Sequence, residues 1–373
     1  MKKKLGDIFE IGSGGTPSKT HSEYYGGNIP WIKTGDLKAK YIDNADEYIT
    51  EAGIKNSSAK MYDVDTVLIA MYGATIGETS ILRISACTNQ ACAAFKPSKE
   101  VLPEYLYYFL QSKKRQFVKD GVGGAQPNIS AGYLKKVRMD ILPLQEQQYV
   151  VDVLNKANSI IDTRLKELQK LDDLIKARFV EKFGEPVSNK KGWRTESMTD
   201  VAPAVNSTNK VKGNVWLLNL DMVEAQTGRI IEYLNVPTSE IGNSTCAFDT
   251  SNVLYSKLRP YLNKVVIPDR CGYATSELVP LQPVRSIMNR EYFAFMLRSD
   301  EFVKLISDKV AGAKMPRVSM GDFRKFPVPI PPIELQNQFA AFVAQVDKSK
   351  AAVQQALDKA KLLFDSLMQQ YFG

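Results

Sequence analysis

Three short segments of the sequence carry residue types that serve phosphate binding, base methylation or phosphodiester cleavage in other proteins. In residues 12–20, a phosphate-binding loop would need glycine immediately before Lys19 and again five positions earlier, where this chain has Ser18 and Ser13. Pro17 also lacks the backbone N–H that such a loop would donate to phosphate. We therefore interpret this segment as a flexible, polar surface turn.

The second segment, Asn-Ile-Pro-Trp at residues 28–31, is similar to the Asn/Asp-Pro-Pro-aromatic motif with which amino-methyltransferases grip a flipped base. Ile29 stands where that motif has proline, and no glycine-rich strand–turn–helix segment for a methyl donor precedes it. Trp31, like Trp216 in the second half of the chain, is better explained as a core aromatic at the end of a strand.

The third segment, Pro268 and Asp269 followed by Glu277, approximates a nuclease pattern in which the lysine is replaced by Val279. Metal-assisted cleavage is therefore unsupported. The single histidine, His21, lies in a polar, glycine-rich region and offers no catalytic triad. These departures favour a non-catalytic chain. A self-sufficient DNA amino-methyltransferase or nuclease with degenerate motifs is the alternative.

Basic and uncharged polar residues on predicted loops of both halves have the chemistry to bind DNA. Lysine and arginine neutralise phosphates, and the release of counterions makes such binding sensitive to salt. Asparagine and glutamine pair with adenine edges, and arginine pairs with guanine. The candidate DNA-binding residues are Thr16, Ser18, Lys19, Lys33, Thr34, Tyr72, Thr75, Asn89 and Gln90 in the first half, and Asn206, Lys210, Lys212, Lys257, Arg259, Tyr261, Asn263, Lys264 and Ser276 in the second. Further basic residues on predicted loops, Arg317 among them, add to the same surface.

The composition is that of a folded, basic protein. The chain has 373 residues, 49 Lys and Arg against 41 Asp and Glu, a formal net charge of +8 and 44% hydrophobic residues. This length predicts two or three folding units. The four cysteines form neither a disulfide scaffold nor the paired ligands of a zinc site, so we expect reduced thiols and no bound metal.

The sequence also predicts a cytoplasmic protein. No run of 18 apolar residues exists, so we expect no segment that spans a membrane. The basic residues 2–4 resemble the start of a signal peptide, but Asp7 and Glu10 interrupt the stretch that would have to be apolar. We therefore expect the chain to stay unexported.

A long internal repeat organises the chain. Residues 104–112 (Glu-Tyr-Leu-Tyr-Tyr-Phe-Leu-Gln-Ser) return as residues 291–299 (Glu-Tyr-Phe-Ala-Phe-Met-Leu-Arg-Ser), a shift of 187 positions. The pair Phe183-Gly184 returns as Phe372-Gly373 after a shift of 189. Because several matches occur in the same order at nearly the same shift, we interpret them as a duplication.

Each repeat has two parts of different composition. Residues 1–144 and 185–333 are rich in Gly, Pro, Thr and Tyr and contain short β-branched runs between turn signals, which predicts two mixed domains with short strands. Residues 145–184 and 334–373 lack proline and interior glycine, which predicts a central and a C-terminal long helix.

The two helical segments share a heptad pattern, in which apolar residues advance by alternating steps of four and three and predict a coiled coil. The seam residues are Val150, Leu154, Ile161, Leu168, Leu171 and Ile175 in the first segment, and Phe339, Val343, Val346, Val353, Leu357 and Phe364 in the second. Arg164 and Lys350 interrupt the two seams, where a polar residue costs stability and can fix the register. The alternative is a pair of amphipathic helices, each packed only on its own domain.

Particular motifs within the duplication resemble the specificity subunit of type I restriction–modification systems. They are Leu-Gly-Asp-Ile at 5–8, Gly-Gly-Thr-Pro at 14–17, Ile-Pro-Trp-Ile-Lys-Thr-Gly-Asp-Leu at 29–37, Met-Tyr-Gly-Ala-Thr-Ile-Gly at 71–77, Thr-Asn-Gln-Ala at 88–91, Gln-Pro-Asn-Ile-Ser at 126–130 and Leu-Pro-Leu-Gln-Glu-Gln-Gln at 142–148. The second half departs from these forms, for example in Leu-Arg-Pro-Tyr-Leu at 258–262. Such divergence is expected where two domains read different sequences.

The resemblance implies an α+β fold, in which two mixed α/β target recognition domains are separated by two long helices that form an antiparallel coiled coil with a pseudo-two-fold internal repeat. Each recognition domain would bind one half of a split, asymmetric site in double-stranded DNA, and the helices would set the gap between the halves. The helices would also dock two methyltransferase subunits, which carry S-adenosylmethionine, so this chain would bind no cofactor itself. Restriction subunits would join separately. A coiled-coil scaffold without a nucleic-acid role is a further alternative.

Overall fold

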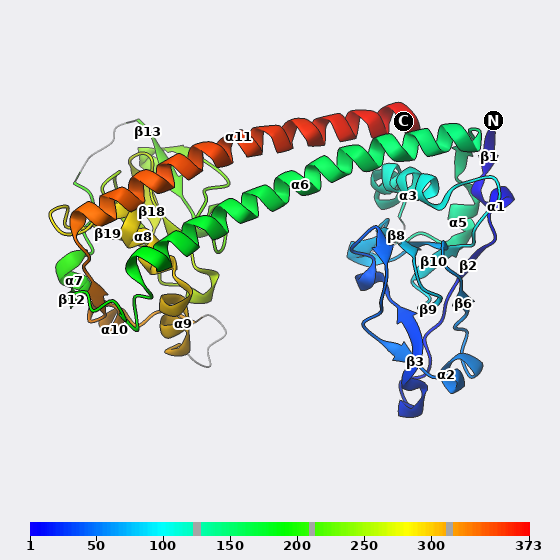
Figure 1. Ribbon diagram of the computed structural model, residues 1–373, viewed down its shortest axis with the longest axis horizontal. Coiled ribbons are helices and arrows are strands. Elements are labelled where there is room, and N and C mark those ends of the chain that lie inside the picture. The colour runs from blue at the N-terminus through cyan, green and yellow to red at the C-terminus, as the bar shows by residue number, and fades with distance from the viewer. Residues whose placement is uncertain (122–127, 209–212, 311–315) are drawn as a thin grey trace. The chain divides into compact units, whose positions relative to one another are not determined.

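The structure, a computed structural model, describes residues 1–121, 128–208, 213–310 and 316–373. The chain divides into two compact units, the first made of residues 1–165 and 355–373 and the second of residues 166–354. Helices α6 (Leu144–Phe183) and α11 (Ile333–Phe372) run through both units, so that one part of each helix belongs to the first unit and the rest to the second (Figure 1). Both helices begin one residue before the predicted helical segments, and the predicted division of the chain into four domains stays a prediction.

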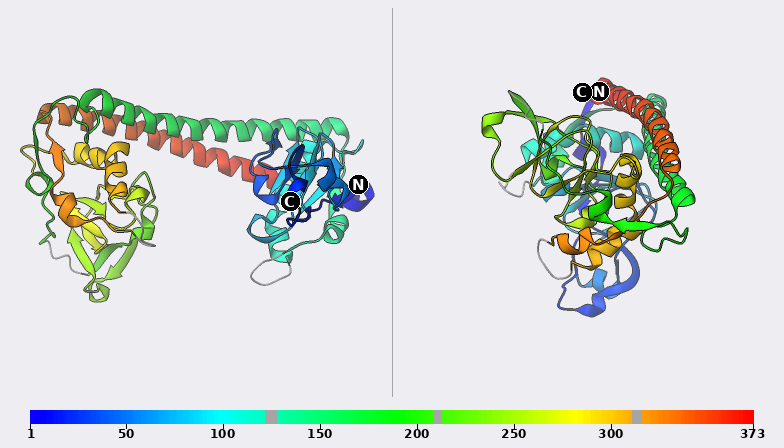
Figure 2. Two further views of the ribbon diagram at one scale, coloured as in Figure 1. Left: turned by 90° about the horizontal axis from the view of Figure 1, so that it is seen from below. Right: turned by 90° about the vertical axis from the view of Figure 1, so that its left-hand side faces the viewer.

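The two long helices pack on each other in both units. In the first unit, Val150 and Leu154 of α6 share a buried cluster with Phe372 at the end of α11. In the second unit, the rings of Phe179 and Phe183 from the end of α6 each lie 5.5 Å from the ring of Phe339 at the start of α11. The start of each helix thus packs with the end of the other, so the helices are antiparallel, as predicted. Figure 2 shows α11 beside α6 from two further directions.

The polar interruption of the second seam has a partner across the helix pair. The Lys350 ammonium lies 2.6 Å from a carboxylate oxygen of Asp172 on α6, and 29% of the lysine side chain is exposed. The other predicted seam residues are buried or half-buried. A charge at the seam is therefore neutralised by an acidic residue from the facing helix, which links the two helices at one register.

The first unit combines short strands with helices. Its elements before α6 are β1 (Lys2–Lys4), α1 (Leu5–Ile8), β2 (Ile11–Ser13), η1 (Ser22–Tyr24), β3 (Tyr25–Ile32), η2 (Thr34–Asp36), β4 (Tyr41–Ile42), β5 (Tyr48–Ile49), α2 (Glu51–Lys55), β6 (Met61–Tyr62), β7 (Val67–Ala70), η3 (Gly73–Thr75), β8 (Thr79–Leu82), β9 (Ala86–Thr88), β10 (Cys92–Phe95), α3 (Pro103–Ser112), α4 (Lys114–Asp120), α5 (Ala131–Lys136) and β11 (Arg138–Asp140). The strands form sheets in the orders β2-β10-β7-β8-β4, β5-β3-β9-β6 and β1-β11.

The second unit repeats this plan. Its elements between α6 and α11 are β12 (Thr195–Ser197), α7 (Met198–Val201), β13 (Asn214–Leu218), η4 (Leu220–Met222), β14 (Leu234–Pro237), η5 (Thr238–Glu240), β15 (Thr245–Phe248), β16 (Val253–Ser256), η6 (Pro260–Leu262), β17 (Val265–Val266), β18 (Gly272–Thr275), β19 (Leu278–Leu281), α8 (Arg290–Arg298), α9 (Asp300–Asp308), α10 (Met320–Arg324) and β20 (Pro327–Pro329). The strands form sheets in the orders β14-β13-β18-β15, β17-β16-β19 and β12-β20. The predicted internal repeat and the mixed α/β domains are confirmed.

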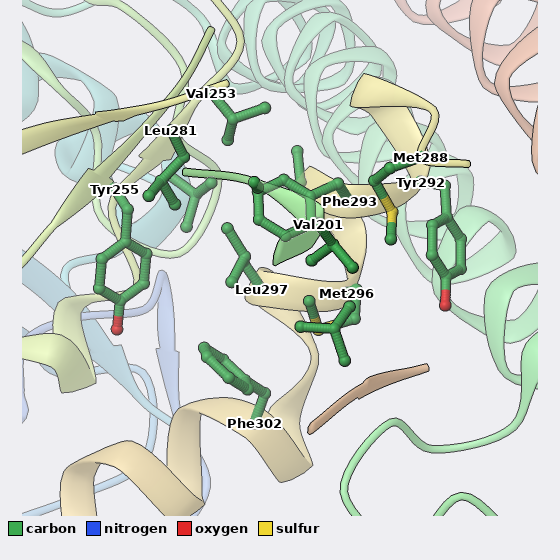
Figure 3. Close-up of a cluster of buried hydrophobic side chains, with 14 of the residues drawn as sticks. Val201, Val253, Tyr255, Leu281, Met288, Tyr292, Phe293, Met296, Leu297 and Phe302 are labelled. Atoms are coloured by element: carbon green, nitrogen blue, oxygen red, sulfur yellow. The ribbon is translucent and has the colours of Figure 1, made fainter. Parts of the chain in front are cut away.

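The same layers build the core of each unit. Helix α3 lies against β7 and β8 in the first unit, and α8 lies against β16 and β17 in the second. In Figure 3, Val253, Tyr255 and Leu281 from the sheet face Phe293 and Leu297 from α8. The duplicated segment that repeats at a shift of 187 thus forms the central helix of each domain.

One buried polar residue is duplicated together with its hydrogen bonds. Gln147 in the first turn of α6 is fully buried, and its amide donates to the carbonyl oxygens of Glu100 and Leu142, each at 2.8 Å, while it accepts from the Leu102 N–H at 2.9 Å. Gln336 in α11 is equally buried and makes the corresponding three bonds to the backbone of Ile287, Pro331 and Asn289. Because a buried amide needs partners, the glutamine fixes the start of each long helix to its own domain.

Candidate nucleic-acid interface

Two parallel strands bring the central loops of the first domain to one edge. Strand β3 pairs with β9, with Trp31 opposite Cys87 and Ile32 opposite Thr88. The N–H of Asn89 then donates to the carbonyl of Ile32 at 2.9 Å. Because parallel strands end at the same side of a sheet, Lys33 and Thr34 after β3 lie beside Asn89 and Gln90 after β9.

The N-terminal loop of the first domain is attached to this edge. The N–H of Gly15 donates to the carbonyl of Thr88 at 2.9 Å, the indole of Trp31 donates to the carbonyl of Gly15 at 3.0 Å, and the hydroxyl of Thr16 donates to the side-chain oxygen of Gln90. A Cβ atom on Gly14 would stand 1.8 Å from the carbonyl oxygen of Thr88.

This attachment corrects our interpretation of residues 12–20 as a flexible surface turn. Gly14, Gly15 and Pro17 are buried, and both glycines are needed because a Cβ atom on Gly14 would overlap Thr88 of β9 and one on Gly15 would overlap the backbone of Ser58 and Ala59. Ser18 and Lys19 follow on the exposed side, where the hydroxyls of Ser18 and Thr20 are 2.8 Å apart.

Two further chain segments, after β7 and before α5, complete the edge. The N–H of Met71, after β7, donates to the carbonyl of Ala91 at 2.8 Å, and the N–H of Ile129 donates to the carbonyl of Met71 at 3.0 Å. Tyr72 forms an isolated β-bridge with Asn128, and 44% of Tyr72 is exposed. The Thr75 hydroxyl donates to the carbonyl of Tyr72 at 3.1 Å. We call the resulting surface the first loop edge; it comprises Thr16, Lys33, Thr34, Tyr72, Thr75, Asn89, Gln90 and Asn128.

One cation of the first loop edge already has an acidic partner. The Lys33 ammonium donates to Glu47 and lies 6.0 Å from the centroid of the Trp31 ring. The hydrogen bond to Glu47 raises the pKa of Lys33, with a smaller contribution from the charges of nearby carboxylates. Lys33 therefore stays protonated at neutral pH, and a phosphate would have to compete with Glu47 for its ammonium group.

The second domain builds an edge with the same backbone pattern. Strand β13 runs parallel to β18, with Trp216 opposite Gly272. The N–H of Lys257, after β16, donates to the carbonyl of Glu277 at 3.0 Å, and the N–H of Val318 donates to the carbonyl of Lys257 at 2.8 Å. These bonds repeat those of Met71, Ala91 and Ile129 in the first domain.

The side chains of the second edge carry charge. Leu258 bridges to Arg317, and the Nη2 of Arg317 lies 3.0 Å from a carboxylate oxygen of Glu277. The N–H of Arg259 donates to the carbonyl of Pro316 at 2.8 Å, and Ser276 is exposed next to Glu277. We call this surface the second loop edge; it comprises Lys257, Leu258, Arg259, Ser276, Glu277 and Arg317.

Four other predicted DNA-binding residues of the second half are not part of the second loop edge. Asn206 is exposed next to Ser207, whose N–H donates to the carbonyl of Ala247 in β15 at 2.9 Å. Tyr261 is 47% exposed in η6. Lys210 and Lys212 lie outside the described residues.

Two predicted DNA contacts are corrected by the structure. Asn263 is only 7% exposed, and its amide donates to the carbonyl of Arg298 at 3.0 Å from a left-handed backbone conformation (φ 49°). The Lys264 ammonium donates to the carbonyl of Leu220 at 2.8 Å, and burial lowers its pKa. Both side chains hold loops of the second domain in place through these bonds, while the Asn263 Oδ1 is buried without a hydrogen-bond partner among the described residues.

The candidate set from the sequence lacks three residues of the loop edges, namely Asn128, Leu258 and Glu277, and it has Arg317 only among the further basic loop residues. The repeat contained a signal that could have found Asn128 from Arg317. Asn128-Ile129-Ser130 returns as Arg317-Val318-Ser319 at a shift of 189, so the two positions correspond. Only the structure shows that this segment reaches the strand ends.

The structure offers few groups for metal or covalent chemistry. Among the described residues, no cluster of three or more His, Cys, Asp or Glu side chains is arranged to hold a metal ion. All four cysteines are free, and burial raises the pKa of Cys87 to about 11 and that of Cys92 to about 12. The helices of the described part include none with the length and apolar character that crossing a membrane requires.

Comparison with known proteins identifies the family. Residues 1–172 and 235–361 match the model of the type I restriction modification DNA specificity domain, and the chain belongs to this family. Among curated relatives, the MjaIX specificity subunit of Methanocaldococcus jannaschii is 25% identical over 401 aligned positions, which cover 98% of this chain and 91% of that protein. The EcoR124I/EcoR124II specificity subunit of Escherichia coli is 28% identical over 177 positions, 45% of this chain and 44% of that protein.

Solved structures share the fold. A chain from a structure that addresses complex assembly and conformational transition of the type I restriction–modification system aligns with a TM-score of 0.63 at 15% identity, covering 100% of this chain and 97% of that chain. The type I restriction–modification S subunit from M. genitalium aligns with a TM-score of 0.55 at 14% identity, covering 100% and 96%. At these identities the likeness concerns the fold.

These findings confirm the predicted family and function. The chain is a specificity subunit of a type I restriction–modification system and carries DNA-recognition domains. The prediction of a recognition subunit, instead of a self-sufficient methyltransferase or nuclease, agrees with the names of the relatives, which are specificity subunits.

Proposed function

We propose that the first loop edge contacts one half of a split, asymmetric DNA site and that the second loop edge contacts the other half. In this proposal Lys33, Lys257 and Arg259 of the two edges contribute to phosphate binding, as does Lys19 in the exposed part of the N-terminal loop, while Asn89, Gln90 and Ser276 reach the bases. Phosphate contacts position a protein on DNA, whereas contacts to base edges select the sequence.

The observation that carries this proposal is the duplicated backbone with different side chains. In both domains, three chain segments meet through the same two hydrogen bonds, Met71 to Ala91 and Ile129 to Met71 in the first, Lys257 to Glu277 and Val318 to Lys257 in the second. The side chains at these positions differ between the domains. A fixed scaffold with different polar groups is what two readers of unlike sequences require.

We further propose that α6 and α11 set the gap between the half-sites. Each helix has one half in either unit, so its length links the two domains. Recognition elements on one face of DNA generally sit about 34–36 Å apart, one helical turn, which predicts an unread spacer of several base pairs.

The same helices are proposed to dock two methyltransferase subunits that carry S-adenosylmethionine, with restriction subunits joining separately in the cytoplasm. Large apolar side chains remain exposed on both helices, where a partner could cover them. They include Ile160, Leu165, Leu174 and Val180 on α6 and Leu362 and Leu363 on α11, which are 41–69% exposed.

The spacer proposal is tested by shortening both helices. Deleting one heptad from α6 and the corresponding heptad from α11 keeps the seam in phase, so we expect the spacer to shorten while both half-sites stay unchanged. Sequencing of modified bases in a host that carries the deletion variant measures both. An unchanged spacer would contradict the proposed role of the helices.

The recognition role is tested with the purified chain. We expect it to incorporate no labelled methyl group into DNA unless methyltransferase subunits are added. We also expect its duplex affinity to fall by orders of magnitude between about 50 and 200 mM salt, because counterions are released on phosphate binding. Methylation by the chain alone would support a self-sufficient enzyme, and an affinity indifferent to salt would support a scaffold without a DNA role.

A further inference from the structure

At each loop edge, one exposed residue is followed directly by a buried residue, and the two exposed residues occupy corresponding positions in the repeat. Asn128 and Arg317 are both exposed, and each is followed by a residue that anchors the backbone. Ile129 is 3% exposed and Val318 is 7% exposed. Because the buried residue that follows is similar in both domains, the two sites differ in the exposed side chain at position 128 or 317.

The next residue adds a second anchor. Ser130 and Ser319 cap helices α5 and α10, accepting hydrogen bonds from the N–H groups of Tyr133 at 3.1 Å and Asp322 at 3.4 Å. A capping serine fixes the conformation of the residue that starts a helix. The side chains of Asn128 and Arg317 therefore leave the two domains from matching, rigid backbone positions.

Arg317 is oriented by an acidic neighbour. Its Nη2 lies 3.0 Å and its Nε 3.5 Å from the two carboxylate oxygens of Glu277, which engages one edge of the guanidinium. Among the described residues Glu277 is the one hydrogen-bond partner of this guanidinium, so the Nη1–Nη2 end can make two parallel hydrogen bonds, and 58% of the Arg317 side chain is exposed. Guanine presents O6 and N7 as two acceptors at the spacing that such an arginine matches.

The charge of Glu277 argues against a phosphate contact at this position. A carboxylate next to a phosphodiester is repelled by it, whereas a base edge carries no net charge. The apolar neighbour Leu258, which bridges to Arg317, likewise offers nothing to a phosphate oxygen.

Asn128 has the matching chemistry for another base. Its carboxamide presents an N–H donor beside a carbonyl acceptor, the pair that adenine complements through N7 and N6. Its bridge partner Tyr72 is uncharged.

We infer that Asn128 and Arg317 are corresponding specificity-determining residues, with Arg317 selecting a guanine in one half-site and Asn128 selecting an adenine in the other. This inference rests on the proposed function of the two loop edges. It adds the identity of the residues that select a base and the class of base that each selects.

The test uses the full chain assembled with its methyltransferase subunits and compares Arg317→Gln with Arg324→Gln, an equal charge change at an exposed position on α10. Modified-base sequencing should show that R317Q relaxes one guanine position of one half-site, with preference falling about 5- to 150-fold. The other half-site should stay unchanged, and R324Q should keep the wild-type motif. Asn128→Ser should relax one adenine position in the opposite half-site.

Glu277→Gln provides a second test that keeps the shape of the site. It frees the guanidinium from its charged partner, and we expect partial relaxation at the same guanine. Uniform weakening of R317Q on all sequences, with a salt slope reduced by about 1, would identify a phosphate contact and overturn the inference. If the wild-type complex itself shows no sequence preference, the proposed function fails instead.

Discussion

The two recognition domains share the hydrogen bonds that anchor the start of each long helix and differ at their loop edges. Gln147 and Gln336 make the same three hydrogen bonds at the start of the two long helices, while Asn128 corresponds to Arg317 and Tyr72 to Leu258. The repeat thus retains the residues that position each domain on its helix and changes the residues that face outward. The comparison therefore separates the residues that stabilise each domain from those that we propose to read DNA.

We expect the largest loss of stability when the buried glutamine at the start of a long helix is replaced. Gln147→Leu leaves the backbone groups of Glu100, Leu102 and Leu142 without partners, at about 1–3 kcal/mol each, so we expect a loss of about 4 kcal/mol in the first unit. Gln336→Leu should cost a similar amount in the second unit. Hydrogen exchange locates each loss, and urea denaturation measures its size.

Exposed neighbours provide matched controls for these two variants. Gln148→Leu and Gln338→Leu replace glutamines on the outer faces of α6 and α11 and should change stability by less than about 0.5 kcal/mol. Markedly unequal losses for Gln147→Leu and Gln336→Leu would argue against equivalent interiors.

A smaller effect is expected from a residue that only the first domain uses. Gly14→Ala places a Cβ atom 1.8 Å from the carbonyl oxygen of Thr88, and the strain should cost about 2–3 kcal/mol. The loop should also move Thr16 away from Gln90 and weaken reading of the first half-site. Gly35→Ala, whose Cβ atom would meet open space, should leave stability unchanged. Equal stability of the two variants would show that the loop around Gly14 can shift without cost.

The smallest effect concerns a lysine enclosed by aromatic rings in the first domain. The Lys40 ammonium lies 5.2, 5.5 and 4.6 Å from the ring centroids of Tyr41, Tyr107 and Tyr108, and it donates to Asn155 on α6 at 2.6 Å. Burial lowers its pKa to about 8. The second domain has Phe295 and Ala344 at the positions that correspond to Tyr108 and Asn155, so this contact marks a real difference between the domains.

A lowered lysine pKa has a definite consequence for stability. Between about pH 8 and the ordinary lysine value, the unfolded chain binds a proton that the folded chain does not, so the free energy of unfolding contributed by Lys40 rises with pH. Lys40→Met removes this dependence. We expect the stability of the wild type relative to K40M to rise from pH 7.5 to 9.5 in urea denaturation. A constant difference would contradict the burial of this ammonium.

Patterns along the chain predicted the architecture well because they reflect periodicity. The heptad steps and the absence of proline indicated two long helices, and the shift of 187 indicated two similar domains. The loop edges were harder to predict, because they are formed by segments far apart in sequence. Asn128 reaches Tyr72 through a backbone bridge, and nothing near either residue signals that pairing.

Errors in the candidate site have the same origin. Asn263 has the right chemistry for DNA, yet its amide is used by the carbonyl of Arg298, which lies 35 positions away. The composition of residues 12–20 predicts a flexible, polar surface turn, yet Gly14 packs on Thr88. Residue type indicates what a side chain can bind, whereas tertiary packing decides whether it is available.

Modified-base sequencing of host DNA, with and without this gene and in the presence of its methyltransferase subunits, tests the central claim most directly. We predict a gene-dependent methylated motif with two unlike halves and a fixed gap between them. A single uninterrupted motif, two identical halves, or a pattern that persists without the gene would contradict it.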